Sequence, residues 1–497
     1  MAMPNVGAKA PDFSVLQTDG KKVALSEFKG KKVVLYFYPK DDTSGCTKEA
    51  CSFRDSDAEL RRAGAVVLGV SADDVDSHQK FTQKFNLNFP LLADTDKSII
   101  NAYGVWGDKV NANTGAVSQG IRRITYLIDE GGKVQKVWPI VTPDGHVAEV
   151  LNAIKHGPYP RVGAGKHTYE WVENFLQQPD SESARKGWSH HGIVVSETSD
   201  IITYHQEDGN VMRFDRNGVF KSSWQGWFAD AHGMTIVKEG DAEALWIADN
   251  GRKRMSKSGY EYPAVQAQVI GQAVKTTLDG QSLLKLPTPP LPAYEKGNYM
   301  PTWVAVNEER LGGNGDVWVA DGYGQSMVHR FSKDGKYLST ITGEEGSAGK
   351  FNTPHSICID RRKGYPELYI ADRSNGRVQV YGLDGKFRRV FGKEFMTSPS
   401  GIVTHGQTMV IAELKARITL VDINDNFVCY IGANESVATA DGWPNNKDEH
   451  GHPVRSRLLQ PGKFNSPHGI AVDKNGNILV AEWLIGGRFI RLEKATI

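Results

Sequence analysis

The chain has 497 residues, and 59 lysines and arginines against 58 aspartates and glutamates give it a net charge of +1. At about 150 residues per domain, this length predicts about three domains. The near-zero charge argues against a nucleic-acid or anionic-membrane binder, which would present a basic surface. Four cysteines are too few for a secreted scaffold held together by disulfides. A charged content of 24% is typical of a soluble globular protein.

The N-terminal segment lacks the pattern of a targeting sequence. Residues 1–11 have no basic start followed by an apolar core, as a secretory signal would. No stretch approaches the roughly 18–20 consecutive apolar residues of a membrane span. We therefore expect a cytoplasmic protein in a reducing compartment, with no membrane partner.

Residues 1–157 alternate between strand patterns and helix patterns. Continuous apolar runs predict buried strands, and apolar positions spaced by three and four predict helices. The predicted elements are, in chain order, strand 32–38, helix 48–63, strand 65–71, helix 75–85, a hairpin over 123–138 and helix 146–156. This alternation predicts an α/β domain of thioredoxin type.

A proline- and glycine-rich stretch at residues 157–165 follows, so we place a linker over residues 158–184. Over residues 185–497 the helical periodicity nearly disappears, and a repeat takes its place. Each repeat starts with a small turn and an apolar strand, and in five of the six a second strand ends in Ala-Asp or Ala-Glu. The starts fall at His191, His232, Thr302, His355, Ser400 and His468. Six repeats spaced by roughly 40–50 residues predict a six-bladed β-propeller.

The first candidate site is centred on Cys46, which follows a buried strand and a glycine turn and opens a helix. Unpaired amides and the dipole at a helix N-terminus favour a thiolate. A thiolate can attack a peroxide and become a sulfenic acid, which a second thiol traps as a disulfide. Cys51 is the candidate second thiol, although the helix would have to unwind locally because side chains at i and i+5 do not face one another. The alternative is a pair of buried structural cysteines.

Three motifs extend this site: Ala10-Pro-Asp-Phe13, Pro39-Lys-Asp-Asp-Thr-Ser-Gly-Cys46 and Arg123-Ile-Thr-Tyr-Leu-Ile-Asp129. Over residues 4–156 the chain resembles the bacterioferritin-comigratory (PrxQ) group of atypical two-cysteine peroxiredoxins. The resemblance implies a peroxide pocket formed by Pro39, Thr43, Cys46 and Arg123. Thr43 would hydrogen-bond the peroxide, and Arg123 would stabilise the thiolate and the developing oxyanion.

The same resemblance implies how the cycle would be completed. Cys51 matches the resolving position of the group, and thioredoxin or a similar dithiol protein is the implied reductant. No cofactor is expected for this reaction. Ser44 occupies a position where these proteins usually have proline, which should loosen the loop without removing a catalytic group.

A second candidate site lies at the repeat starts. His232, His355 and His468 begin the second, fourth and sixth repeats, and repeat starts line the central channel of a propeller. Alternate blades would therefore bring three imidazoles together, and three neutral histidines with an open fourth position suit catalytic zinc or another divalent metal. His191 also begins a repeat and is a further candidate. The alternative is that His-Gly is a turn at the start of a blade.

The middle repeats contain further motifs: Met300-Pro-Thr-Trp-Val-Ala-Val306, Val319-Ala-Asp-Gly-Tyr323, Pro354-His-Ser-Ile357 and Ala371-Asp-Arg-Ser-Asn-Gly-Arg377. Over residues 188–495 the chain resembles the peptidyl-α-hydroxyglycine α-amidating lyase branch of the NHL-repeat propellers. The resemblance implies that the three histidines bind zinc, that Tyr323 is catalytic and that Arg373 binds substrate. The alternatives are an aromatic residue packed on the rim and a surface arginine paired with Asp372.

Two positions depart from the lyase pattern. Gln206 occupies the place of the second arginine of that family, and Gly469 occupies the place of an aspartate. The second change argues against a structural calcium. The metal site is therefore expected to be retained, whereas the resemblance does not fix the substrate or the reaction.

These patterns leave three functions open. The first is a thiol-dependent peroxidase that reduces hydrogen peroxide and organic hydroperoxides through a Cys46 sulfenic acid and a Cys46–Cys51 disulfide. The second adds a metal-dependent lyase or hydrolase in the propeller. The third is a non-catalytic propeller that docks a small molecule or a protein, since no basic patch indicates nucleic acid.

Overall fold

The computed structural model describes residues 3–4, 6–110, 117–157, 159–181, 184, 187–189, 191–205, 210–251 and 270–495. Gln206, one of the two departures from the lyase pattern, lies outside these ranges. The chain divides into two compact units, residues 1–159 and 160–495. Within the described ranges, no helix combines the length and the apolar character that a membrane span requires.

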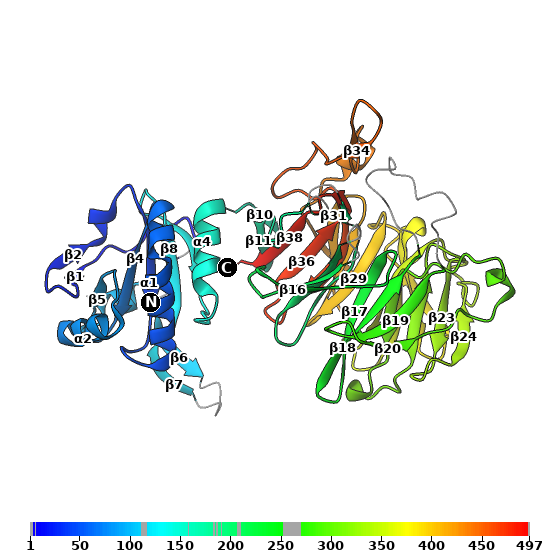
Figure 1. The fold of residues 1–497 in the computed structure, drawn as a ribbon, viewed down its shortest axis with the longest axis horizontal. Coiled ribbons are helices and arrows are strands. Elements are labelled where there is room, and N and C mark those ends of the chain that lie inside the picture. The colour runs from blue at the N-terminus through cyan, green and yellow to red at the C-terminus, as the bar shows by residue number, and fades with distance from the viewer. Residues whose placement is uncertain are drawn as a thin grey trace. The chain divides into compact units, whose positions relative to one another are not determined.

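The N-terminal unit is built on a five-stranded sheet in the order β5-β4-β3-β8-β9, with helices on both faces (Figure 1). Its strands are β3 (Lys32–Phe37), β4 (Ala65–Ser71), β5 (Leu91–Ala93), β8 (Ile124–Ile128) and β9 (Val134–Trp138). Its helices are α1 (Ser44–Arg62), α2 (Val75–Phe85), α3 (Ser98–Ala102) and α4 (His146–His156). Two hairpins lie outside the sheet: β1 (Ser14–Leu16) with β2 (Lys22–Ala24), and β6 (Trp106–Val110) with β7 (Val117–Ile121).

The central strand β3 explains why this region of the sequence is so apolar. Its side chains alternate between the two faces of the sheet: Val34 and Tyr36 pack with residues of α1 and α4, whereas Leu35 and Phe37 pack with residues of α3. Because both faces are covered, the strand is an unbroken apolar run. The predicted thioredoxin-like fold is confirmed, with one shift of a boundary. Helix α1 begins at Ser44 rather than at residue 48, so Cys46 lies in its first turn.

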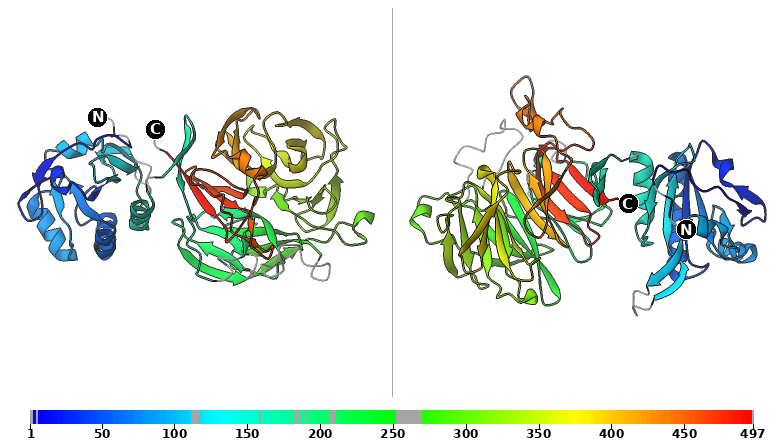
Figure 2. Two further views of the ribbon diagram at one scale, coloured as in Figure 1. Left: turned by 90° about the horizontal axis from the view of Figure 1, so that it is seen from above. Right: turned by 180° about the vertical axis from the view of Figure 1, so that it is seen from behind.

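The C-terminal unit is a six-bladed β-propeller, as predicted, and Figure 2 shows its blades arranged in a ring. Blade 1 contains β13 (Ile193–Val195), β14 (Ile201–His205), β15 (Asn210–Phe214) and β16 (Phe220–Gln225). Blade 2 contains β17 (Ala231–Glu239), β18 (Ala242–Asp249), β19 (Gln272–Thr277) and β20 (Ser282–Lys285). Blade 3 contains β21 (Trp303–Val306), β22 (Val317–Asp321), β23 (Met327–Phe331) and β24 (Tyr337–Ile341). Blade 4 contains β25 (Pro354–Asp360), β26 (Glu367–Asp372), β27 (Arg377–Gly382) and β28 (Phe387–Phe391). Blade 5 contains β29 (Pro399–His405), β30 (Thr408–Glu413), β31 (Arg417–Val421) and β32 (Phe427–Ile431).

Blade 6 combines strands from both ends of the unit. Its strands are, from the centre outward, β35 (Pro467–Val472), β36 (Ile478–Glu482), β38 (Phe489–Lys494), β11 (His167–Val172) and β10 (Arg161–Ala164). The innermost strands of neighbouring blades touch all the way round, and β35 touches β13, so the ring is closed. Two short pairs of strands lie outside the blades: β12 (Trp188–Ser189) with β37 (Leu484–Ile485), and β33 (Asn446–Lys447) with β34 (Pro453–Val454).

The predicted linker over residues 158–184 is therefore wrong in its first half, because strands β10 and β11 belong to blade 6. Gly165, which contributed to the linker prediction, lies in the turn between them with a left-handed backbone (φ +53°). Strand β11 pairs with β38 at the other end of the unit. Composition marks a turn but cannot reveal a pairing partner so distant in sequence.

Candidate functional site

Cys46 lies in the first turn of α1, and its side chain is buried. Thr43 is the residue that caps the helix, with an extended backbone, and its hydroxyl donates to the carbonyl oxygen of Lys40 at 3.2 Å. Arg123, which immediately precedes β8, donates from Nη2 to Cys46 Sγ at 3.3 Å. The half-buried Pro39 follows the end of β3 in the same loop. A helix N-terminus and a guanidinium group together favour a thiolate at Cys46.

Glu49 completes this site, and sequence analysis missed it. Its carboxylate is fully buried and forms an ion pair with Nη1 of Arg123. Burial raises the pKa of Glu49, and the charge of Arg123 opposes that rise. Burial likewise opposes the charge of Arg123, but Glu49 and Cys46 together raise its pKa. The guanidinium is thus held in its charged form beside the thiol. The spacing was the available signal, because Glu49 and Cys46 are i and i+3 neighbours on one helix face.

A buried network holds the loop that precedes α1. The carboxylate of Asp41 accepts hydrogen bonds from Tyr38 Oη at 2.7 Å, Ser77 Oγ at 2.8 Å and His78 Nδ1 at 2.9 Å. Burial alone would raise the pKa of Asp41, but the bonds from His78 and its other partners lower it below its ordinary value. Since Ser77 and His78 belong to α2, this network fixes the loop containing Thr43 to a second helix.

Cys51 is half-buried on the same continuous helix α1 and, like Cys46, is a free thiol. Five residues of a helix rotate a side chain away from its starting direction, so the two sulfur atoms cannot bond while the helix is intact. This agrees with the expectation that α1 must unwind locally before a disulfide can form.

The structure also brings the three predicted histidines of the propeller together. His232 (β17), His355 (β25) and His468 (β35) are completely buried and belong to blades 2, 4 and 6. The Nε2 atom of His468 lies 3.1 Å from that of His232 and 3.2 Å from that of His355. Among the residues that the structure describes, these three form a group able to hold a metal ion.

Backbone carbonyl groups fix how two of these rings are turned. His232 Nδ1 lies 2.9 Å from the carbonyl oxygen of Thr302, and His355 Nδ1 lies 2.6 Å from that of Ser400. A carbonyl oxygen only accepts, so both Nδ1 atoms are protonated and both Nε2 atoms point a lone pair at the centre. Burial lowers the pKa of His232 to about 4, which keeps its imidazole neutral.

This donor set fits a divalent metal. Ligand nitrogens of a tetrahedral zinc site, each at about 2.0–2.1 Å from the ion, lie ~3.3 Å apart, close to the separations between these Nε2 atoms. A metal-bound histidine typically donates its other N–H to a carbonyl or carboxylate, as His232 and His355 do.

The recurring Ala-Asp and Ala-Glu pairs explain how the repeat positions its first residue. In each case the acidic side chain is buried and accepts a backbone N–H from the segment just before the first strand of its own blade. Asp249 accepts from Asp230 N at 2.8 Å, just before His232, and Glu482 accepts from Ser466 N at 2.9 Å, just before His468. The five acidic residues are Asp249, Asp321, Asp372, Glu413 and Glu482. The acidic residue at the end of the second strand thus acts as a clamp: it fixes the backbone just before the residue that faces the channel.

Tyr323 and Arg373 lie beside the histidines. The hydroxyl of Tyr323 lies 3.3 Å from His232 Nε2 and 3.1 Å from His355 Nε2. Arg373 Nη1 donates to that hydroxyl at 3.2 Å, and the guanidinium carbon lies 5.2 Å from the centre of the tyrosine ring. The alternative pairing of Arg373 is not what the structure shows, because Asp372 forms its ion pair with Arg377.

His191, by contrast, is not part of this group. Its Nε2 bonds the carbonyl oxygen of Trp188 at 3.1 Å, and its Nδ1 lies 3.6 Å from the carboxylate of Asp230. Its blade has no acidic clamp in the second strand, where the sequence reads Ile201-Ile-Thr-Tyr-His205. A histidine at a repeat start is therefore not sufficient to reach the centre.

Comparison with known proteins identifies the N-terminal unit. The AhpC/TSA family matches residues 6–137. The putative peroxiredoxin bcp of Coxiella burnetii is 54% identical over 149 residues, which are 30% of this chain and 97% of that protein. The chain belongs to the peroxiredoxin family. Peroxiredoxin Bcp of Bacillus subtilis is 47% identical over 150 residues, 30% of this chain and 94% of that protein, and peroxiredoxin Bcp of Escherichia coli is 43% identical over 149 residues, with the same coverage.

The peroxiredoxin match and the geometry at Cys46 agree, and the N-terminal unit is a thiol peroxidase domain. The rest of this peroxiredoxin is unlike those relatives, since they align with 30% of the chain. The NHL repeat matches residues 464–483, which include His468 and all of the first two strands of blade 6. The chain is therefore a peroxiredoxin domain joined to an NHL-type propeller.

Proposed function

We propose that the chain reduces hydrogen peroxide and organic hydroperoxides with electrons from thioredoxin or a similar dithiol protein. The observation that supports this most directly is the contact between Arg123 and Cys46 Sγ at 3.3 Å, with Glu49 holding the guanidinium from its other side. These groups stabilise a thiolate in a buried site, and the thiolate is the nucleophilic form of cysteine.

In the proposed reaction, the Cys46 thiolate attacks the terminal oxygen of the peroxide. A sulfur–oxygen bond forms, the oxygen–oxygen bond breaks, and the departing oxygen leaves as water or an alcohol after taking a proton. Arg123 stabilises the charge that develops on the oxygen atoms, and the Thr43 hydroxyl hydrogen-bonds the peroxide. The product at Cys46 is a sulfenic acid.

In the second step, α1 unwinds at its N-terminal end and the Cys51 thiol attacks the sulfur of the sulfenic acid. Water leaves and a Cys46–Cys51 disulfide remains, which an external dithiol reduces by thiol–disulfide exchange. The half-buried position of Cys51, one and a half turns along the helix, supports a short-range rather than an intermolecular disulfide.

The test compares two cysteine variants of the full chain. Cys46→Ser should lower the rate of peroxide-dependent oxidation of thioredoxin by at least about 10³-fold, because the nucleophile is lost. Cys51→Ser should still consume one equivalent of peroxide but should not turn over with thioredoxin. Cys358→Ser, which changes a thiol of blade 4, is the matched control and should behave as the parent chain. Turnover that survives in Cys46→Ser would refute the assignment.

We also propose that the propeller binds zinc or another divalent metal through His232, His355 and His468 and acts as a lyase or hydrolase. The supporting observation is the convergence of the Nε2 atoms with their Nδ1 atoms tied to backbone carbonyls. A divalent ion held there would act as a Lewis acid toward a bound hydroxyl group or water molecule.

The neighbouring side chains favour a substrate of amidating-lyase type, an N-acyl-α-hydroxyglycine. Arg373 would pair with the carboxylate of the substrate. Tyr323, which contacts Arg373 and two of the histidines, would accept the proton of the substrate's hydroxyl group as a phenolate and then pass it to the leaving nitrogen. The carbon–nitrogen bond then breaks, the C–O bond becomes a carbonyl, and the nitrogen takes up a proton. The products are a primary amide and glyoxylate.

The first test is metal content of the full chain. Chelated protein titrated with zinc should bind one equivalent, measured by elemental analysis after gel filtration. His355→Ala should weaken binding by at least about 100-fold, whereas His191→Ala, the matched repeat-start histidine outside the group, should not. No binding above the level of His355→Ala would contradict the proposal.

The second test is turnover of α-hydroxyhippurate, followed as glyoxylate release. The zinc-loaded parent chain should release glyoxylate, and Tyr323→Phe should lower the rate by about 10²-fold or more. Metal binding without turnover would reject the lyase chemistry and would favour the propeller as a docking module.

A further inference from the structure

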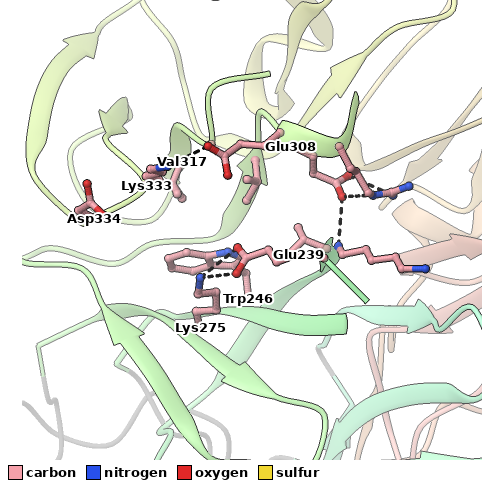
Figure 3. Close-up of a pocket in the computed structure, with 14 residues that line it drawn as sticks. Glu239, Trp246, Lys275, Glu308, Val317, Lys333 and Asp334 are labelled. Carbon is pink, nitrogen blue, oxygen red and sulfur yellow. Dashed lines mark hydrogen bonds and ion pairs between the residues drawn. The ribbon is translucent and has the colours of Figure 1, made fainter. Parts of the chain in front are cut away.

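A cavity of about 260 Å³ lies between blades 2 and 3 (Figure 3). It is at the opposite end of the strands from the histidines. His232 is near the start of β17, whereas the cavity is lined by Val237 to Gly240 at and just beyond its end. A strand rises about 3.3 Å per residue, so the cavity is roughly 20 Å from His232. It is therefore separate from the proposed metal centre.

Trp246, in β18, forms part of the cavity wall and has an unsatisfied polar atom. Its side chain is 1% exposed, and Nε1 has no hydrogen-bond partner within the described part of the chain. A buried N–H without an acceptor is unfavourable, and such groups are rare in folded proteins. Because Trp246 lines the cavity, the natural place for the missing acceptor is an occupant of this space.

The inner wall presents more donors than acceptors. Lys275 is directly opposite Trp246 in the neighbouring strand, is 14% exposed, and lies with its Nζ 5.9 Å from the centre of the indole. Its carboxylate partner Glu239, at 2.9 Å, is 54% exposed and sits on the rim. Figure 3 shows the indole beside this pair.

The buried acid of the cavity is already engaged. Glu308, 16% exposed, accepts from Arg310 Nε at 2.7 Å and from the backbone N–H of Lys238 at 3.1 Å. In Figure 3 it lies across the cavity from Trp246. Val237, Val306 and Val317 supply an apolar part of the wall. Much of the rest of the lining is charged, and its exposed pair, Lys333 and Glu309, is joined at 2.9 Å.

We propose that this cavity binds a small organic carboxylate with an apolar body. The carboxylate would accept from Trp246 Nε1 and from the Lys275 ammonium, replacing the solvent-exposed Glu239 as the partner of that lysine. The apolar body would pack against the three valines. The volume is just below the ~300–1,000 Å³ typical of sites for drug-sized ligands, which fits a metabolite-sized acid. An ammonium ligand would face Lys275 and an N–H donor at the indole, while three carboxylates of the lining, Glu239, Glu308 and Glu309, already pair with cations. Inorganic phosphate has no apolar body to bury.

The test is isothermal titration of the chelated full chain with benzoate. Benzoate should bind one site with a Kd below about 10 mM, and the uncharged benzamide should bind at least about tenfold more weakly. Trp246→Phe, which removes the N–H and keeps a ring, should weaken benzoate by about tenfold. Trp318→Phe is the matched control, because Trp318 holds the same place in blade 3, also lacks a partner for Nε1 in the described chain, and does not line the cavity.

Lys275→Gln provides a second variant in case Trp246→Phe does not fold, and it should also weaken benzoate by about tenfold. Three results would overturn the proposal: no saturable binding of benzoate, equal binding of benzoate and inorganic phosphate, or benzoate binding that Trp246→Phe and Lys275→Gln leave unchanged. Binding lost in His355→Ala but retained in both cavity variants would place the acid at the histidines and would equally overturn it.

Discussion

The thiol site of the N-terminal unit is centred on one turn of one helix, whereas the histidine group of the propeller takes each member from a different blade. Cys46 and Glu49 share one helix turn, and Arg123 reaches them from the edge of an adjacent strand. His232 and His468 are 236 residues apart, yet their Nε2 atoms are 3.1 Å apart.

The two constructions suit different chemistry. In the proposed cycle the thiol site comes apart, because a disulfide between Cys46 and Cys51 would require α1 to unwind. One helix end can fray without disturbing the rest of the fold. A buried acidic residue holds the backbone just before each histidine, and carbonyl oxygens of the adjacent blades orient the rings of His232 and His355. The comparison teaches that a site proposed to unwind during its reaction lies on one helix end, while a group that needs fixed ring orientations draws its supports from several blades.

The largest expected effect is on the thiol site and concerns Arg123. Arg123→Met removes the group that contacts Cys46 Sγ, and the rate of sulfenic acid formation should fall by about 10²–10³-fold. The measurement is trapping of the sulfenic acid with a dimedone reagent, counted by mass spectrometry. Arg122→Met is the matched control, since Arg122 donates to the carbonyl oxygens of Gly104 and Val105 instead. An equal loss in both variants would show that the effect is structural.

The next effect tests the clamps of the propeller. Glu482→Gln leaves Arg488, which is fully buried, without one of its two carboxylate partners. Breaking a buried ion pair of this kind should cost about 3 kcal/mol of unfolding free energy, measured by urea denaturation of the full chain. Glu435→Gln is the control, because Glu435 is a half-exposed partner of Arg417 and a surface pair contributes less than about 1 kcal/mol.

The same variant tests whether a loss of stability in the propeller affects the N-terminal unit. Glu482→Gln should leave the rate of Cys46 oxidation unchanged, because every residue of the thiol site belongs to the N-terminal unit. A matching fall in that rate would show that the two units depend on each other, and the comparison between a local and a distributed site would fail.

Much of this molecule could be predicted because its signals are local or repeated. The apolar run at 32–38 predicted its strand, and the apolar spacing at 75–85 predicted its helix. Histidines at alternate repeat starts predicted the group at the centre of the propeller. The hairpin of β10 and β11 was mistaken for a linker because its partner β38 lies at the far end of the unit. Glu49 was missed because its importance comes from burial, which depends on what α1 packs against.

Other features exist only in three dimensions. Trp246 and Lys275 meet because strands β18 and β19 pair across a long intervening segment, and no spacing in the sequence indicates the cavity beside them. Asp41 likewise looks like one of two acids in an exposed loop, yet it is buried against α2.

The smallest of the expected effects concerns Asp41. It tests how much the hydrogen bonds of this side chain stabilise the loop that precedes α1. Asp41→Asn should destabilise the N-terminal unit by about 2 kcal/mol near neutral pH, the size of a hydrogen bond to a charged group. Because the pKa of Asp41 is lower in the folded chain than in the unfolded chain, its contribution is complete above the unfolded value and is lost as the pH falls through the folded value. The difference between the parent chain and Asp41→Asn, measured by urea denaturation, should therefore shrink below about pH 4. Asp55→Asn, which changes an exposed acid of α1, should show no such difference, and a pH-independent loss in Asp41→Asn would mean that packing rather than charge holds the loop.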